Sequence, residues 1–192
     1  MVNTFNFTDI HLGNAEALAY HEGVPGHHLQ FSIVQKLTGI PEFRKYREYT
    51  AYTEGWALYA EQLGKDLGFY QDPYSDYGRL QSDVWRSIRL VVDTGLHSKH
   101  WTRQQVVDFC HEHSSVEETN VQRETDRYIA WPGQALGYKI GQLKLLDLRR
   151  RARTELGERF DIKKFHDLIL DSGAVPLDVL DTKVAGWIAL QK

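Results

Sequence analysis

The stretch HEGVPGHHLQ, residues 21–30, begins like a zinc-hydrolase motif and then departs from its spacing. In the motif H-E-x-x-H, two histidines lie one helical turn apart, and the glutamate next to the first activates a water molecule. Here Pro25 stands where the second histidine belongs. On an unbroken helix His27 would lie roughly 120° around the axis from His21, and His28 would lie about 10 Å along it. A regular helix therefore cannot present either histidine together with His21 to one ion.

The Gly-Pro-Gly chemistry of this stretch predicts that the helix breaks. Pro25 lacks an N–H, and its ring clashes with the carbonyl four residues before it, while Gly23 and Gly26 add backbone freedom. A break would bring the next histidine back toward His21. We therefore expect one helix to end near Glu22 and another to begin near Gly26, with a metal site formed across the break.

Helical periodicity dominates the rest of the chain and predicts a mainly α fold, with at most a short N-terminal strand in TFNF at 4–7. Asn14 fits the N-cap of the first helix, AEALAYHE, and Gly39 and Pro41 should end the second. Further helices are expected at 41–67, 77–98, 102–113, 116–127, 134–156 and 163–171.

Length and composition favour one globular domain over residues 1–192, with 42% hydrophobic residues. A formal charge of -3 without a basic face argues against nucleic acid or a membrane surface as partners. No apolar run is long enough to span a bilayer, and Cys110 is the only cysteine, so no internal disulfide can form. The N-terminus lacks the order of a signal peptide, which makes the cytoplasm the default location unless upstream sequence is missing.

A third protein ligand is expected in the helical segment TEGWALYAE. In one large class of hydrolytic zinc sites, a glutamate from a following helix supplies this ligand and water keeps the fourth position. Glu54 and Glu61 are seven residues apart and share a helix face. Glu54 is the better candidate, because Gly55 leaves space beside its carboxylate.

Five segments together resemble the C-terminal part of the bacterial domain-of-unknown-function 885 proteins: HEGVPGHHLQ, EGWALYAE, VVDTGLHSKHW, RYIAWPGQALGYKIGQ and FHDLILDSGAVPLDVL. That family is similar to zinc peptidases of the thimet oligopeptidase and thermostable carboxypeptidase type, whose helix reads H-E-F-G-H-A-L. The resemblance implies one half of a helical zincin-like metallopeptidase, with His27 as the second ligand and His28 as the alternative.

The same resemblance implies that the chain corresponds to about the last third of a longer architecture. The N-terminal helices that complete the substrate channel would then be missing. We expect weak or absent activity from residues 1–192 alone, together with self-association or pairing with the missing helical part.

Several polar residues are candidates for catalysis. Glu22 would act as the general base. Arg127, Tyr128 and Tyr138, around the turn at 132–133, are candidates for polarising a carbonyl oxygen. His97 either lines the cleft, oriented by Asp93 four residues before it, or forms a local helical pair with that residue.

The sequence thus predicts a bacterial zinc-dependent hydrolase in which His21, His27 and Glu54 hold Zn²⁺. Its substrate would be a peptide, or a small amide if the enzyme is a non-peptide amidase. Two other hypotheses stay open: a metal that only stabilises a non-catalytic helical interaction domain, and a helical module without metal. Substrate identity and the choice between exo- and endo-cleavage are not encoded in these motifs.

Overall fold

The computed structural model describes residues 12–46 and 48–192, and all regular structure in these ranges is helical. The predicted mainly α fold is confirmed, while the strand expected at 4–7 lies outside the described residues. The α-helices are α1 (Ala15–Glu22), α2 (His27–Lys36), α3 (Glu42–Tyr46), α4 (Thr50–Asp66), α5 (Pro73–Lys99), α6 (Arg103–His113), α7 (Glu118–Ala130), α8 (Gly137–Leu156), α9 (Ile162–Leu170) and α10 (Leu177–Gln191). Short 3₁₀ helices η2 (Leu12–Asn14), η3 (Gln134–Leu136) and η4 (Gly157–Arg159) complete the set.

The main differences from the sequence-based expectation concern α3 and α4, the start of α5, and α10. The helix expected at 41–67 is divided into α3 and α4, although residues 46–50 contain neither glycine nor proline. The helix expected from 77 begins at Pro73, because the Asp72 side chain accepts the N–H of Tyr74 and caps it. The last helix, α10, was not predicted, although its buried Leu180, Val184 and Ile188 recur every four residues.

The contacts group the chain into two compact units. The described part of unit 1 comprises residues 12–20 and 61–136, and unit 2 comprises residues 21–60 and 137–192. The prediction of a single domain over 1–192 stays a prediction. None of the described helices is long and apolar enough to cross a bilayer.

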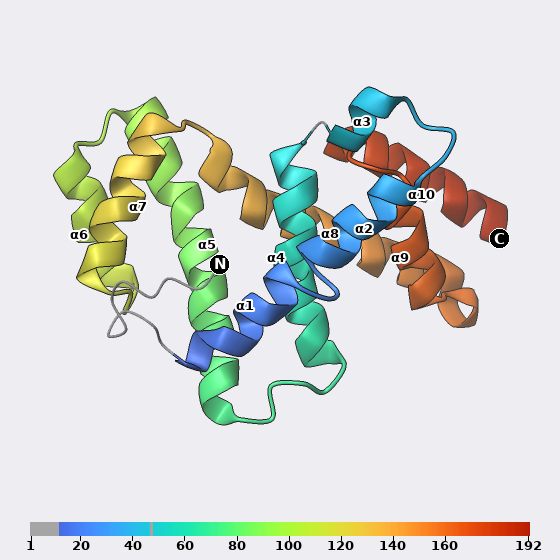
Figure 1. Cartoon of the computed structure of the whole chain (residues 1–192), viewed down its shortest axis with the longest axis horizontal. Helices are drawn as coiled ribbons and strands as arrows, with labels where there is room; N and C mark the ends of the chain where they lie inside the picture. The colour runs from blue at the N-terminus through green and yellow to red at the C-terminus, as the bar shows by residue number, and fades with distance from the viewer. Residues whose placement is uncertain (1–11, 47) are drawn as a thin grey trace. The chain divides into compact units, whose positions relative to one another are not determined.

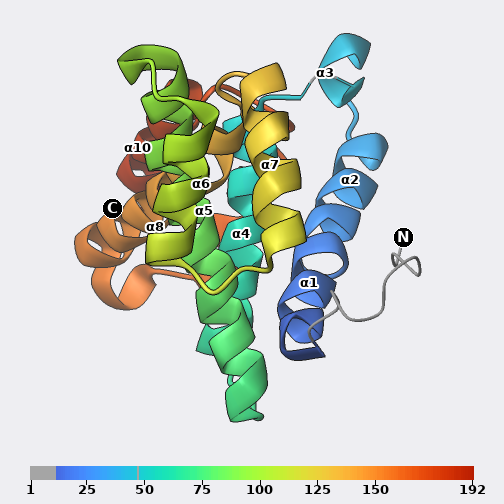
Figure 2. The ribbon, with the colours of Figure 1, turned by 90° about the vertical axis from the view of Figure 1, so that its left-hand side faces the viewer.

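Unit 1 is built on α5, which packs against α6 and α7 (Figures 1 and 2). Most of its core consists of apolar side chains from these three helices, among them Trp85, Val92, Val106 and Val121. The α6 helix starts at a capping box in which Thr102 and Gln105 satisfy each other's backbone N–H groups. This packing gives unit 1 its own hydrophobic core.

Unit 2 contains most of α4 together with α2, α3, α8, α9 and α10, and within it α8 packs against α10. The α4 helix is buried almost all round: Trp56 and Tyr59 are 1% and 0% exposed. It meets α8 backbone to backbone, since a Cβ added to Gly141 would lie 1.8 Å from the carbonyl oxygen of Ala51. Glycine is therefore required at this crossing, where the contacted residue, Ala51, lies about one helical turn before Glu54.

Candidate metal centre

The break between α1 and α2 is present as predicted. The first helix ends at Glu22, the second begins at His27, and residues 23–26 form the turn between them. The N–H of Gln30 donates to the carbonyl of Gly26 at 3.0 Å and so starts the second helix. The indole Nε1 of Trp56 donates to the carbonyl of Pro25 at 2.8 Å. A side chain of α4 thus holds the turn in place.

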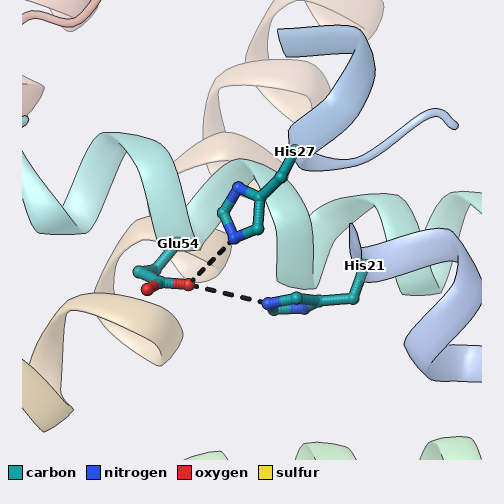
Figure 3. A group of neighbouring side chains, drawn as sticks. All are labelled: His21, His27 and Glu54. Atoms are coloured by element: carbon teal, nitrogen blue, oxygen red, sulfur yellow. Dashed lines mark hydrogen bonds and ion pairs between the residues drawn. The ribbon is translucent and has the colours of Figure 1, made fainter. Parts of the chain in front are cut away.

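The break brings His21 and His27 together with Glu54 (Figure 3). Glu54 Oε2 lies 3.2 Å from Nε2 of His27 and 3.6 Å from Nε2 of His21. One ligand atom of each residue lies within 4.8 Å of the others. The two imidazole rings are perpendicular, with centroids 4.9 Å apart, and Nε2 of each is the nitrogen near Glu54 Oε2.

This donor set fits a divalent zinc ion. Two imidazoles and one carboxylate form the usual set of a hydrolytic zinc site, which leaves a coordination position open for water. Burial opposes ionisation of Glu54, but hydrogen bonds from the two histidines and from Tyr138 outweigh it and hold the pKa of that carboxyl well below its usual range. The carboxylate is therefore in the form that binds a cation. The buried Nδ1 of His27 has no hydrogen-bond partner among the described residues, which leaves Nε2 as the nitrogen facing the cluster.

Tyr138 borders the cluster. It is the second residue of α8, its hydroxyl donates a hydrogen bond to Glu54, and its ring is stacked on that of His21 at 6.4 Å. The close approach of α8 to α4 at Gly55 makes this contact, because a Cβ on Gly55 would lie 2.4 Å from Cα of Gly141. The space that the sequence assigned to a group approaching Glu54 is thus occupied by a helix backbone.

The two histidines left open by the sequence occupy different positions. His27 belongs to the cluster, whereas the side chain of His28 is exposed on α2. Glu22 is the last residue of α1, follows His21 directly and is exposed. Glu61, the other acid of TEGWALYAE, is 2% exposed, accepts from Ser82 and pairs with Arg86.

Tyr128 lies in the core of unit 1, where it is 1% exposed. Its hydroxyl accepts a hydrogen bond from Nε of Arg89 at 3.0 Å, and burial raises the pKa of that hydroxyl. Arg127 pairs with Glu124 and donates to Gln134. These contacts give both residues a structural use in unit 1, and their catalytic role stays a prediction.

His97 and Asp93 are also in unit 1, and each has another partner. His97 is exposed and its Nε2–H donates to the carbonyl of Tyr128 at 3.0 Å. The carboxylate of Asp93, which is 2% exposed, accepts the N–H of Gly133 at 3.0 Å. Asp93 therefore fixes the turn before η3, and a catalytic role for His97 stays a prediction.

Sequence reasoning missed Trp56 as the residue that holds the ligand-bearing turn. Its place in an apolar helix predicts burial, and burial is observed at 1% exposure. Nothing in the local sequence indicates that its indole reaches Pro25, which precedes it by 31 residues.

Comparisons with known proteins agree with the fold. A family described as a bacterial protein of unknown function (DUF885) matches residues 1–184. The crystal structure of a candidate lipoprotein from Colwellia psychrerythraea superposes with a TM-score of 0.96 at 46% identity, covering 98% of this chain and 32% of that one.

A candidate lipoprotein of unknown function from Shewanella oneidensis gives a TM-score of 0.80 at 22% identity over 86% of this chain and 30% of that one, a likeness in fold. None of the curated proteins matches. The chain spans about a third of the length of these two solved relatives.

Proposed function

The chain belongs to the DUF885 family, and from that premise and the geometry of the cluster we propose that it is the metal-binding part of a zinc-dependent hydrolase that cleaves peptide bonds. The observation that carries the proposal is the convergence of His21, His27 and Glu54 across a broken helix. On an unbroken helix the spacing of the two histidines would keep them apart. The break between α1 and α2, held by Trp56 of α4, brings them close together.

In this proposal each residue has one task. His21, His27 and Glu54 hold the ion. Zinc supplies Lewis acidity, which polarises a carbonyl oxygen and makes water a stronger acid. The carboxylate of Glu22 takes a proton from the attacking water and passes it to the leaving amine. The hydroxyl of Tyr138 turns from Glu54 to the carbonyl oxygen of the substrate and donates to it there.

Two observations favour catalysis over a metal that only stabilises the fold. The turn between α1 and α2 is already tied to α4 by the hydrogen bond from Trp56 to Pro25, so a metal is not needed for that link. Glu22 is exposed and directly follows a proposed ligand in the sequence, and a structural metal site has no use for a carboxylate in that position. The resemblance to zinc peptidases supports peptides over other amides as substrates.

The decisive experiment compares Glu22→Gln with the wild type and with Glu158→Gln, an exposed glutamate of unit 2. Zinc per chain is measured by elemental analysis, and hydrolysis is measured on a mixed peptide library. Glu22→Gln should keep its zinc and lose hydrolysis by about 10²- to 10⁴-fold, because it removes a base and no ligand. Glu158→Gln should keep both. Well under one zinc per chain in the wild type, after zinc is supplied, would refute the proposal, and hydrolysis by Glu22→Gln would assign the base elsewhere.

The complete cleft is proposed to need more than this chain, since the chain spans about a third of its solved relatives. We expect residues 1–192 alone to be weakly active and to self-associate or pair with the remaining part. Light scattering, and assays of this chain against a longer form of the protein, test this. A monodisperse monomer with the activity of the longer form would contradict it.

The location proposed for the whole protein is the cell envelope, because the two solved relatives are candidate lipoproteins. This replaces the cytoplasmic default taken from the first residues of the sequence. Cell fractionation followed by detection of the protein tests it, and recovery in the cytoplasmic fraction alone would count against it.

A further inference from the structure

A second feature of unit 2 is a cavity of about 230 Å³ beside the metal centre. Its walls come from α2, from α3 and the residues after it, from the start of α4, and from the turn that follows α9. Val34 and Leu170 make part of the lining apolar. The volume lies below the range of about 300–1,000 Å³ typical of sites for whole drug-sized ligands, which suits one residue of a larger substrate.

Gln30 is the unexplained polar group of this cavity. It lines the wall and is 4% exposed, yet neither its amide oxygen nor its amide nitrogen has a hydrogen-bond partner among the described residues. Leaving a buried donor or acceptor without a hydrogen bond costs about 1–3 kcal/mol of folding free energy. A ligand that both accepts and donates a hydrogen bond in the cavity would remove that cost.

Arg44 gives the cavity its charge. One guanidinium nitrogen donates to the carbonyl of Ser172 at 2.6 Å, and among the described residues Arg44 has no carboxylate partner. Lys45 also lines the wall but is paired with Glu42 at 2.8 Å, and the single acid of the lining, Glu48, is exposed. The cation left without a counter-charge is therefore Arg44, and guanidinium binds carboxylates with two parallel hydrogen bonds.

The cavity adjoins the metal centre through two elements. Phe31 forms part of its wall and is stacked on His27 with ring centroids 5.6 Å apart. Thr53, another wall residue, directly precedes Glu54 in α4. Gln30 follows His27 by three residues and so lies on the same face of α2. A substrate held at the metal would reach the cavity with a neighbouring residue.

We propose that this cavity is the subsite that binds a carboxylate of the substrate, with Arg44 and the amide nitrogen of Gln30 as donors and the amide oxygen of Gln30 accepting a substrate N–H. The inference rests on the proposed function, since it names the substrate group that this centre selects. The carboxylate is either the free C-terminus of a peptide or the side chain of an aspartate or glutamate next to the scissile bond. The two sources share the same chemistry and are separated by experiment.

The test uses protein stripped of metal with a chelator, so that no carboxylate can bind to zinc. N-acetyl-leucine, N-acetyl-leucinamide and N-acetyl-glutamic acid α-amide are titrated and binding is followed by NMR chemical shifts. At least one of the two carboxylates should bind at least tenfold more tightly than the neutral leucinamide. Tight binding of N-acetyl-leucine identifies a C-terminal carboxylate, and tight binding of the glutamate compound identifies an acidic side chain. Equal binding of all three would overturn the proposal.

Variants locate the site. Arg44→Gln should weaken carboxylate binding about tenfold or more, since it removes a charge-assisted hydrogen bond. Arg153→Gln, at an exposed arginine of α8, is the matched control and should bind as the wild type does. Gln30→Leu should also weaken binding but should not lower the melting temperature, because it replaces an unpaired buried amide by an apolar group. Wild-type binding in both Arg44→Gln and Gln30→Leu would overturn the proposal.

Failure of the subsite and failure of the proposed function can be told apart. Carboxylate binding to stripped protein needs neither zinc nor Glu22. Suppose the protein takes up no zinc but binds carboxylates selectively, and Arg44→Gln abolishes that binding. This result would refute the zinc hydrolase and support the carboxylate subsite. Zinc-dependent hydrolysis of peptides without any preference for a carboxylate would support the proposed hydrolase function and refute the carboxylate subsite.

Discussion

Replacing Gly141 by alanine should push α8 away from α4 and disturb the metal centre. The added Cβ would lie 1.8 Å from the carbonyl oxygen of Ala51, where ordinary contact begins at 3.4 Å, and a backbone oxygen cannot rotate aside. Overpacking of this kind costs about 1–3 kcal/mol, and the backbone contact places Gly141→Ala at the upper end of that range. The better helix propensity of alanine returns up to about 1 kcal/mol. The expected net loss is about 2 kcal/mol.

For a chain of this size that loss corresponds to a melting temperature lower by about 4–8 °C. Gly186→Ala is the matched control: this glycine lies inside α10 with nothing within 4 Å of an added Cβ, so alanine should raise the melting temperature by about 2–4 °C. Differential scanning calorimetry measures both, and zinc titration should show weaker binding by Gly141→Ala, because displacement of α8 removes the hydrogen bond by which Tyr138 supports the proposed ligand Glu54. A Gly141→Ala protein that melts at or above the wild-type temperature would refute the backbone contact as a constraint.

Three further predictions address single side chains. His27→Ala should release zinc and His28→Ala should retain it, as elemental analysis will show; the reverse pattern would move the ligand by one residue. Burial raises the pKa of the Cys110 thiol to about 11, so at pH 8 it should react with a disulfide reagent far more slowly than after unfolding, and equal rates would contradict the burial. Burial, followed by the charge of Arg149, lowers the pKa of His166 to about 4. Because the unfolded chain takes up that proton near pH 6.5 and the folded chain does not, stability should fall as the pH drops from 6.5 to 4, by no more than about 2 kcal/mol after allowance for partial exposure. His166→Phe should remove this part of the pH dependence in chemical denaturation, and an unchanged difference between pH 6.5 and 4 would count against it.

The parts of the site that sequence could predict are those governed by local chemistry. Pro25, flanked by Gly23 and Gly26, breaks the helix whatever the later sequence is. Only with this break can His21 and His27, at their spacing in the sequence, face the same ion. The preference for Glu54 over Glu61 followed from a neighbouring glycine. The structure places Glu54 with the two histidines, but the neighbouring glycine has another use, because Gly55 accommodates the backbone of α8.

The parts that sequence missed depend on contacts between distant segments. Tyr128 and Tyr138 are equivalent candidates by sequence, and only the packing of α8 on α4 puts the hydroxyl of Tyr138 on Glu54. No glycine or proline marks the division between α3 and α4 in the sequence. The α4 helix starts where the carbonyl of Tyr49 accepts the N–H groups of Tyr52 and Thr53. A helix boundary of this kind cannot be recognised from the residue types in the sequence.

The hydrogen bond from Trp56 to Pro25 means that the histidine pair is not a self-sufficient chelating module. A synthetic peptide of residues 15–36 would carry both histidines and the turn, yet it would lack the indole that fixes the turn and the carboxylate that completes the donor set. Its two imidazoles would sample many separations, and a zinc titration would detect only the weak, flexible complexation of any histidine-bearing oligopeptide. Grafting the motif into another scaffold therefore requires transplanting α4 along with it.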